Sequence, residues 1–215
     1  MNKFLSLRNV ISLYAFILIV WGFYRFLFKL PEAIEEVVLK PLLWLVPLIL
    51  VLRREKATLG SVGWTTQNLF KSVYLAIGLG ILFAAEGAVV NSIKYGGSFN
   101  FIQIPAGAAL LGALGLSLVT ALSEETVFRG FIFNRLWKAF QGEWSANLLT
   151  SSGWALIHLP VTVFVLKYDV AQAVSFLFLT FLFGVASAFV FARTGNVFSS
   201  VLLHVFWEWP IILFR

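Results

Sequence analysis

The most informative feature of this sequence is how little charge and sulfur it contains. Cysteine is absent from all 215 residues, which excludes disulfides, thiolate zinc sites and a cysteine nucleophile. Charged residues make up only 12% of the chain while hydrophobic residues make up 60%, a composition far from that of a soluble domain. The mean hydropathy of +0.91 agrees with this. The sequence therefore predicts an all-α, polytopic transmembrane helical bundle.

The few charges that are present indicate how the chain is oriented. The formal net charge is +6, but the lysines and arginines lie between apolar runs, as topology signals do, so we expect no nucleic-acid partner. The most basic loop is 53–71, which the positive-inside rule places in the cytoplasm together with the amino terminus. The compact size favours a prokaryotic cell membrane. We expect an integral, multi-pass membrane protein in contact with lipids.

Long apolar runs predict about seven or eight helices that cross or enter the membrane. The first run is too long for a signal peptide, has Arg25 and Lys29 at its end and lacks a small-residue cleavage site, so we expect it to be a span. No boundary divides residues 1–215, which we expect to form one integral-membrane domain with a motif-bearing core over 106–214. The expected spans are Val10–Phe28, Pro41–Leu52, Ser72–Val90, Ala106–Phe140, Ser145–Leu159, Ala171–Ala192 and Val197–Phe214. The second is short for a span unless its helix begins near Ala33, and the fourth is long enough for two helices.

Three charged residues inside the fourth apolar run require an explanation. Glu124 and Glu125 are followed by Arg129, and charges within a membrane are costly enough to mark a functional site. Glu125 and Arg129 are four residues apart, so a helix places them on one face as an ion pair. This pairing leaves Glu124 for other chemistry. A simple charge cluster at the membrane boundary is the alternative interpretation.

Both histidines of the chain lie in apolar runs. His158 precedes Pro160, and His204 lies one helical turn before Glu208 on the same face. Counting about 1.5 Å per residue from the cytoplasmic boundaries places Glu124 roughly 16 Å deep, His158 roughly 20 Å and His204 roughly 12 Å. Since these depths fall in one middle layer, we expect the side chains to meet in one internal cavity that opens to the cytoplasm.

These runs resemble the three motifs of the CAAX prenyl protease and bacteriocin-processing (CPBP, or Abi) family of intramembrane proteases. The motifs are Glu124-Glu125-x-x-x-Arg129, Trp154-x-x-x-His158 and His204-x-x-x-Glu208. The resemblance implies a hydrolase, an endopeptidase that cleaves a membrane-associated or lipidated peptide or protein substrate without a cofactor or a metal. It further implies that Glu124 and His158 activate water, that His204 and Glu208 stabilise the oxyanion, and that Glu125 and Arg129 support the site.

Glu208 departs from the family's pattern, in which asparagine or aspartate is usual at this position. An ionised carboxylate accepts hydrogen bonds and repels an oxyanion, so Glu208 can act as a donor only when it is protonated. Trp154 also departs from the usual phenylalanine, but it preserves an aromatic wall.

Several other functions are compatible with the same residues. Two histidines and two glutamates could bind zinc, although the His-Glu-x-x-His signature is missing. Ser151 or Ser152 could pair with a histidine as a nucleophile. An aspartyl protease is excluded because that mechanism needs two aspartates and Asp169 is the only one. A non-catalytic role in bacteriocin immunity or transport is the alternative from another class, and Glu86 would suit a transport path.

Overall fold

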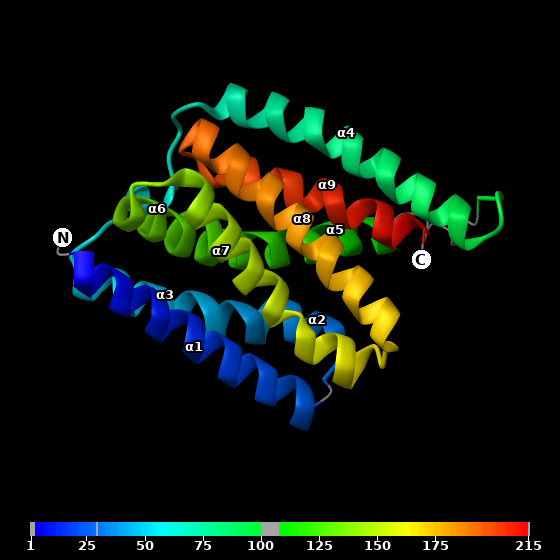
Figure 1. The fold of residues 1–215 in the computed structure, drawn as a ribbon, viewed down its shortest axis with the longest axis horizontal. Coiled ribbons are helices and arrows are strands. Elements are labelled where there is room, and N and C mark those ends of the chain that lie inside the picture. Colours follow the sequence, from blue (N-terminus) through cyan, green and yellow to red (C-terminus); the bar gives the residue numbers. More distant parts are fainter. Residues whose placement is uncertain (1–2, 29, 100–107, 215) are drawn as a thin grey trace.

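The protein is a bundle of helices, as the sequence predicts (Figure 1). The computed structural model describes residues 3–28, 30–99 and 108–214. Within these ranges every regular element is helical and there is no strand. The predicted all-α class is therefore confirmed. Residues 100–105 of the expected loop between the third and fourth spans, residues 106 and 107 of the expected fourth span, and Arg215 lie outside the described residues.

The helices follow one another with short connections. In three places the helix widens to π geometry, at η1, η3 and η4, and the run from α5 to α6 continues through η3 without a break. The elements are α1 (Lys3–Leu27), α2 (Glu32–Ile34), η1 (Glu35–Leu39), α3 (Lys40–Glu55), η2 (Leu59–Val62), α4 (Leu69–Lys94), α5 (Ala108–Glu125), η3 (Thr126–Phe133), α6 (Asn134–Phe140), α7 (Glu143–Ile157), η4 (Val161–Val165), α8 (Val170–Thr194) and α9 (Val197–Phe214).

Five stretches of the described residues are long and apolar enough to cross a membrane. Two of the predicted spans, 41–52 and 197–214, are not among these five. The first falls on α3, which continues a helical run that begins at Glu32, and the second on α9, where residues 197–208 form an apolar helix and the side chains from 209 on lie outside the described residues. The five stretches are Phe4–Leu27, Leu69–Ile93, Leu111–Phe140, Glu143–Val165 and Val170–Thr194.

Local signals define the ends of α8 clearly. Asp169 and Gln172 form a capping box, in which the Gln172 backbone N–H donates to the Asp169 carboxylate over 2.8 Å. Gly195 ends the helix with a φ of +64°, a left-handed conformation that glycine adopts without strain. These signals fix the length of the helix that packs along α7 and contributes to the wall of the site.

The central helices pack closely around α5, η3 and α9. α4 lies along α9, and a Cβ atom at Gly80 would lie 2.8 Å from Phe206 of that helix. A Cβ atom at Gly184 of α8 would lie 3.0 Å from Ser151 of α7. Because both approaches need the absence of a side chain, these glycines set the spacing of the helix pairs. All residues of η3 are buried, so the widened turn lies in the centre of the bundle.

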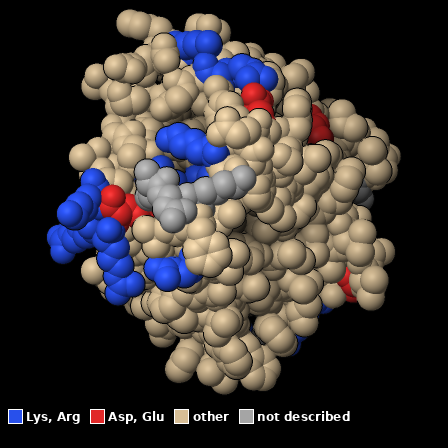
Figure 2. Space-filling model, turned by 60° about the vertical axis from the view of Figure 1, so that its left-hand side comes forward, with Lys and Arg blue, Asp and Glu red and all other residues tan. Residues whose placement is uncertain are grey.

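Lysine and arginine side chains gather at one end of the bundle (Figure 2). This is the end at which α1 begins and α3 and α8 end (Figure 1). Hydrogen bonds join the segments there, for example from Asn9 to Glu55 over 3.0 Å and from Asn68 to the carbonyl oxygen of Thr194 over 2.8 Å. We call this end the basic face and define it by six exposed side chains, Arg8, Arg53, Arg54, Lys56, Lys138 and Arg193.

Candidate active site

Glu124 and Glu125 are the last two residues of α5, directly before the π-helical turn η3. Both side chains are buried, Glu124 with 4% and Glu125 with 0% of its surface exposed. π-helical turns are rare and occur often at functional sites, because they change the direction of neighbouring side chains within a continuous helix. The two carboxylates accordingly reach different partners.

Glu124 is held between a lysine and a tryptophan. The Lys40 ammonium lies 2.8 Å from Oε1 and donates a hydrogen bond to it. The Trp154 indole N–H donates to Oε2 over 2.9 Å. The arrangement holds Glu124 as an ionised carboxylate in one orientation, since each oxygen accepts from a donor on a different helix.

Lys40 belongs to a buried charge network from the amino-terminal part of the chain. It is only 4% exposed and forms a second ion pair with Glu36, one turn earlier in the helix. Glu36 also accepts from the Thr120 hydroxyl over 2.7 Å and from Arg25 over 3.2 Å. The sequence alone did not predict this contribution. The only signal was the i, i+4 spacing of Glu36 and Lys40 in a Glu-rich segment next to an apolar run.

Glu125 forms the predicted ion pair with Arg129, whose guanidinium donates to Oε1 over 3.0 Å. The Ser187 hydroxyl donates to Oε2 over 2.7 Å, and His204 Nδ1 lies 2.7 Å from Oε1. The Arg129 guanidinium also lies 4.6 Å from the centre of the Trp154 ring, a cation–π contact. Glu125 is therefore fully engaged in joining η3, α8 and α9.

The His204 imidazole lies between two carboxylates. Its Nδ1 contacts Glu125, and its Nε2 lies 3.3 Å from Oε1 of Glu208. The other Glu208 oxygen accepts from the Ser117 hydroxyl. A neutral imidazole has only one N–H, so the contacts at both ring nitrogens require an imidazolium or a protonated glutamate. In either case one proton lies between His204 and Glu208.

His158 follows the end of α7 and is half-buried. Its Nδ1 lies 2.8 Å from the backbone carbonyl oxygen of Trp154. A carbonyl oxygen can only accept, so Nδ1 carries the hydrogen and Nε2 of the neutral ring keeps its lone pair. The ring centre lies 4.7 Å from that of Trp154, which restricts the imidazole further. His158 thus presents a basic nitrogen.

The structure brings the proposed catalytic residues to one cavity of about 690 Å³. Glu124, His158, His204 and Glu208 all line it. Lys40 lines it as well. The volume lies within the range typical of ligand sites, roughly 300–1,000 Å³.

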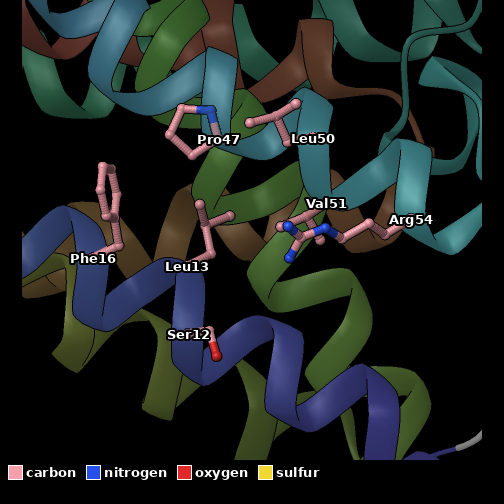
Figure 3. Close-up of a pocket in the computed structure, with 7 residues that line it drawn as sticks. All are labelled: Ser12, Leu13, Phe16, Pro47, Leu50, Val51 and Arg54. Atoms are coloured by element: carbon pink, nitrogen blue, oxygen red, sulfur yellow. The ribbon is translucent and has the colours of Figure 1, made fainter.

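A second depression is a shallow apolar groove of about 170 Å³ between α1 and α3 (Figure 3). None of its seven lining residues is a histidine or a carboxylate, so it lacks the groups that hydrolysis needs. Its lining residues are Ser12, Leu13, Phe16, Pro47, Leu50, Val51 and Arg54.

The residues on which the alternative functions depend lie in environments different from that of Glu124. The Ser151 hydroxyl donates to Asn147 over 3.0 Å, and Ser152 is exposed. Glu86 is half-buried on α4, outside the residues that line the cavity of Glu124. Among the residues that the structure describes, no three histidine, aspartate or glutamate side chains are placed to hold a metal ion.

Comparison with known proteins gave one match. Residues 106–210 match the family model described as "Type II CAAX prenyl endopeptidase Rce1-like". No curated protein and no solved structure matches the chain. The matched segment contains all three sequence motifs, whereas Lys40, Glu36 and Arg25 precede it.

Proposed function

The chain belongs through residues 106–210 to the Rce1-like family of type II CAAX prenyl endopeptidases, and we propose that it is an intramembrane endopeptidase in which Glu124 and His158 activate a water molecule. The observation that carries this proposal is the cavity itself. It brings a buried carboxylate, a basic imidazole and a second histidine–glutamate pair together from three helices.

The first step is the activation of water. His158 offers the lone pair of Nε2, and Glu124 offers a carboxylate fixed by Lys40 and Trp154. Together these two groups remove a proton from the water while the water oxygen bonds to the carbonyl carbon of the scissile peptide bond. When the tetrahedral intermediate collapses, the same proton passes to the leaving amine. The reaction thereby yields a carboxylic acid, which then loses its proton to water, and an amine, without a cofactor.

The second requirement is a donor for the oxyanion. We assign it to the proton between His204 Nε2 and Glu208 Oε1, which are 3.3 Å apart. Glu125 and Ser117 hold the two residues from the opposite sides. Donors that are fixed before the reaction stabilise the developing charge without reorganisation. Glu125 and Arg129 act as supports, because their ion pair anchors His204 rather than lining the cavity.

The decisive variant is Glu124→Gln, which keeps the size of the side chain and removes its basicity. In purified, reconstituted protein presented with membrane-inserted peptides, we expect the cleavage rate to fall by about 100-fold to 10,000-fold. Glu143→Gln is the matched control, since Glu143 pairs with Arg193 at the basic face and lies outside the cavity.

The same experiment separates the enzyme from its alternatives. If folded Glu124→Gln protein cleaves as fast as the wild type, Glu124 is not the base. If neither protein cleaves any peptide while a cellular phenotype of the gene survives Glu124→Gln, the immunity or transport interpretation is favoured instead.

A further inference from the structure

The cavity lies at the end of the bundle opposite the basic face. The order of basic residues and cavity residues along the lining helices shows this, one helix at a time. On α1 the basic face is represented by Arg8, near the start, whereas the cavity residues Trp21 and Arg25 come near the end. On α3 the order is reversed, because Lys40 lines the cavity at the start of the helix and the basic residues come at its end. The two helices run in opposite directions, so both observations place the cavity at the same end of the bundle.

The other lining helices agree. From Glu124 to Lys138 the continuous run of α5, η3 and α6 advances by 14 residues, or about 21 Å at 1.5 Å per residue. On α8 the cavity residue Phe176 is near the start and Arg193 is in the last turn. On α9 the lining begins only at His204, seven residues after the helix start at the basic face.

The rim of the cavity confirms the direction in which it opens. Phe28 and Leu30 line the cavity and are also 57% and 45% exposed. Glu32 and Val165 are further lining residues with exposed side chains. These residues lie where α1 ends, where α2 begins and where η4 ends. The opening is thus at the far end from Arg8 and the other residues of the basic face.

We propose that the cavity opens to the extracytoplasmic side, and that the substrate is a peptide segment presented from that side, such as the exported part of a membrane-anchored precursor. Basic residues remain in the cytoplasm when membrane proteins insert, so the basic face is the cytoplasmic one. This placement reverses the cytoplasmic opening expected from the sequence. A lipidated tail in the cytoplasmic leaflet would meet the closed end of the bundle. The cleavage part of this inference rests on the proposed function, while the topology does not.

The absence of cysteine makes the topology directly measurable. Leu30→Cys places a thiol at the rim, and Thr66→Cys places one in the exposed loop at the basic face. Both changes replace uncharged, exposed residues, so they leave the topology signals intact. Ser98→Cys, beyond the end of α4, is a second reporter for the far side.

The measurement is labelling with a membrane-impermeant maleimide in intact cells, in permeabilised cells and after denaturation, the last giving the total reactive thiol. We expect Leu30→Cys and Ser98→Cys to be labelled in intact cells. Thr66→Cys should be labelled only after the cells are permeabilised. The opposite pattern, or labelling of all three variants in intact cells, overturns the inference.

A second measurement connects the topology to the substrate. In detergent-solubilised protein, where both thiols are accessible, the cleavage rate of each variant is compared before and after its own thiol receives a bulky maleimide polymer. We expect the rate of Leu30→Cys to fall and that of Thr66→Cys to remain unchanged. Unchanged cleavage in fully labelled Leu30→Cys shows that the substrate uses another route and overturns the substrate assignment. If the labelling pattern is as expected but no variant and no wild-type protein cleaves any peptide, the proposed function fails while the topology stands.

Discussion

Lys40 offers the sharpest test of how this site is built, because it is the counter-ion of Glu124 and lies outside the segment that matches the family. Replacing it in Lys40→Met keeps a long apolar side chain and removes only the ammonium. Two buried carboxylates, those of Glu36 and Glu124, then lose the charge that they share. The change should therefore affect both the stability of the bundle and the orientation of the proposed base.

The expected loss of stability depends on the partners that each carboxylate retains. Removing one partner of a buried ion pair typically destabilises a protein by about 3–5 kcal/mol. Here Glu36 retains Arg25 and Thr120, and Glu124 retains the Trp154 indole. We therefore expect a loss at the lower end, about 3 kcal/mol. In a chain of this size such a loss lowers the unfolding midpoint on the order of 10 °C.

The assay combines thermal unfolding in detergent with the cleavage rate below the unfolding temperature. We expect Lys40→Met to lower kcat more than it raises KM, because a loosely held Glu124 affects the reaction more than substrate binding. Lys40→Arg should recover part of both losses, since it restores the charge. The double variant Lys40→Met/Glu36→Gln should recover part of the stability alone, since it removes one uncompensated carboxylate.

Lys138→Met is the matched control, because Lys138 is exposed at the basic face. It should change neither quantity. The reasoning is refuted if Lys40→Met unfolds at the same temperature as the wild type and cleaves at the same rate. Loss of activity with unchanged stability would also contradict it, because the argument derives both effects from one buried ion pair.

Two further predictions concern the oxyanion donor and the metal. Glu208→Asn should keep or raise turnover because an amide N–H donates without titrating, whereas Glu208→Leu should lose roughly 100-fold to 1,000-fold in rate. Loss of activity in folded Glu208→Asn would instead make Glu208 a base or a ligand. Cleavage should continue in the presence of strong chelators, because the described residues provide no group of metal ligands. Stoichiometric zinc in the purified protein, together with loss of turnover on chelation, would favour the metal-dependent alternative.

The features that the sequence predicted correctly depend on short-range regularities. Apolar runs of sufficient length predict helices, because a buried backbone must satisfy its own hydrogen bonds. The pairing of Glu125 with Arg129 follows from the helical repeat alone. Counting residues along helices led us to expect Glu124, His158 and His204 in one layer, and all three line one cavity.

The features that the sequence did not predict depend on how the helices pack. Lys40 and Glu124 are 84 residues apart, and nothing in their local sequence indicates that α3 contacts α5. The π-helical turns also have no simple composition signal, although η1 and η4 contain residues that line the cavity and η3 begins two residues after Glu124. The segment 31–40 carries three glutamates and precedes the expected span at 41–52, so its sequence gives no sign that its side chains are buried. In the structure Glu35 and Glu36 are buried.

The position of Lys40 limits how far the family resemblance determines the chemistry of this chain. The matched segment supplies Glu124, His158 and His204, but the ammonium that contacts Glu124 comes from α3. A carboxylate held against an ammonium stays ionised and keeps its orientation, whereas one surrounded by apolar groups would take up a proton. The same three motifs joined to a different amino-terminal segment would therefore place Glu124 in a different electrostatic environment. The family resemblance indicates the type of reaction, and the residues before the matched segment decide how the proposed base of that reaction is held.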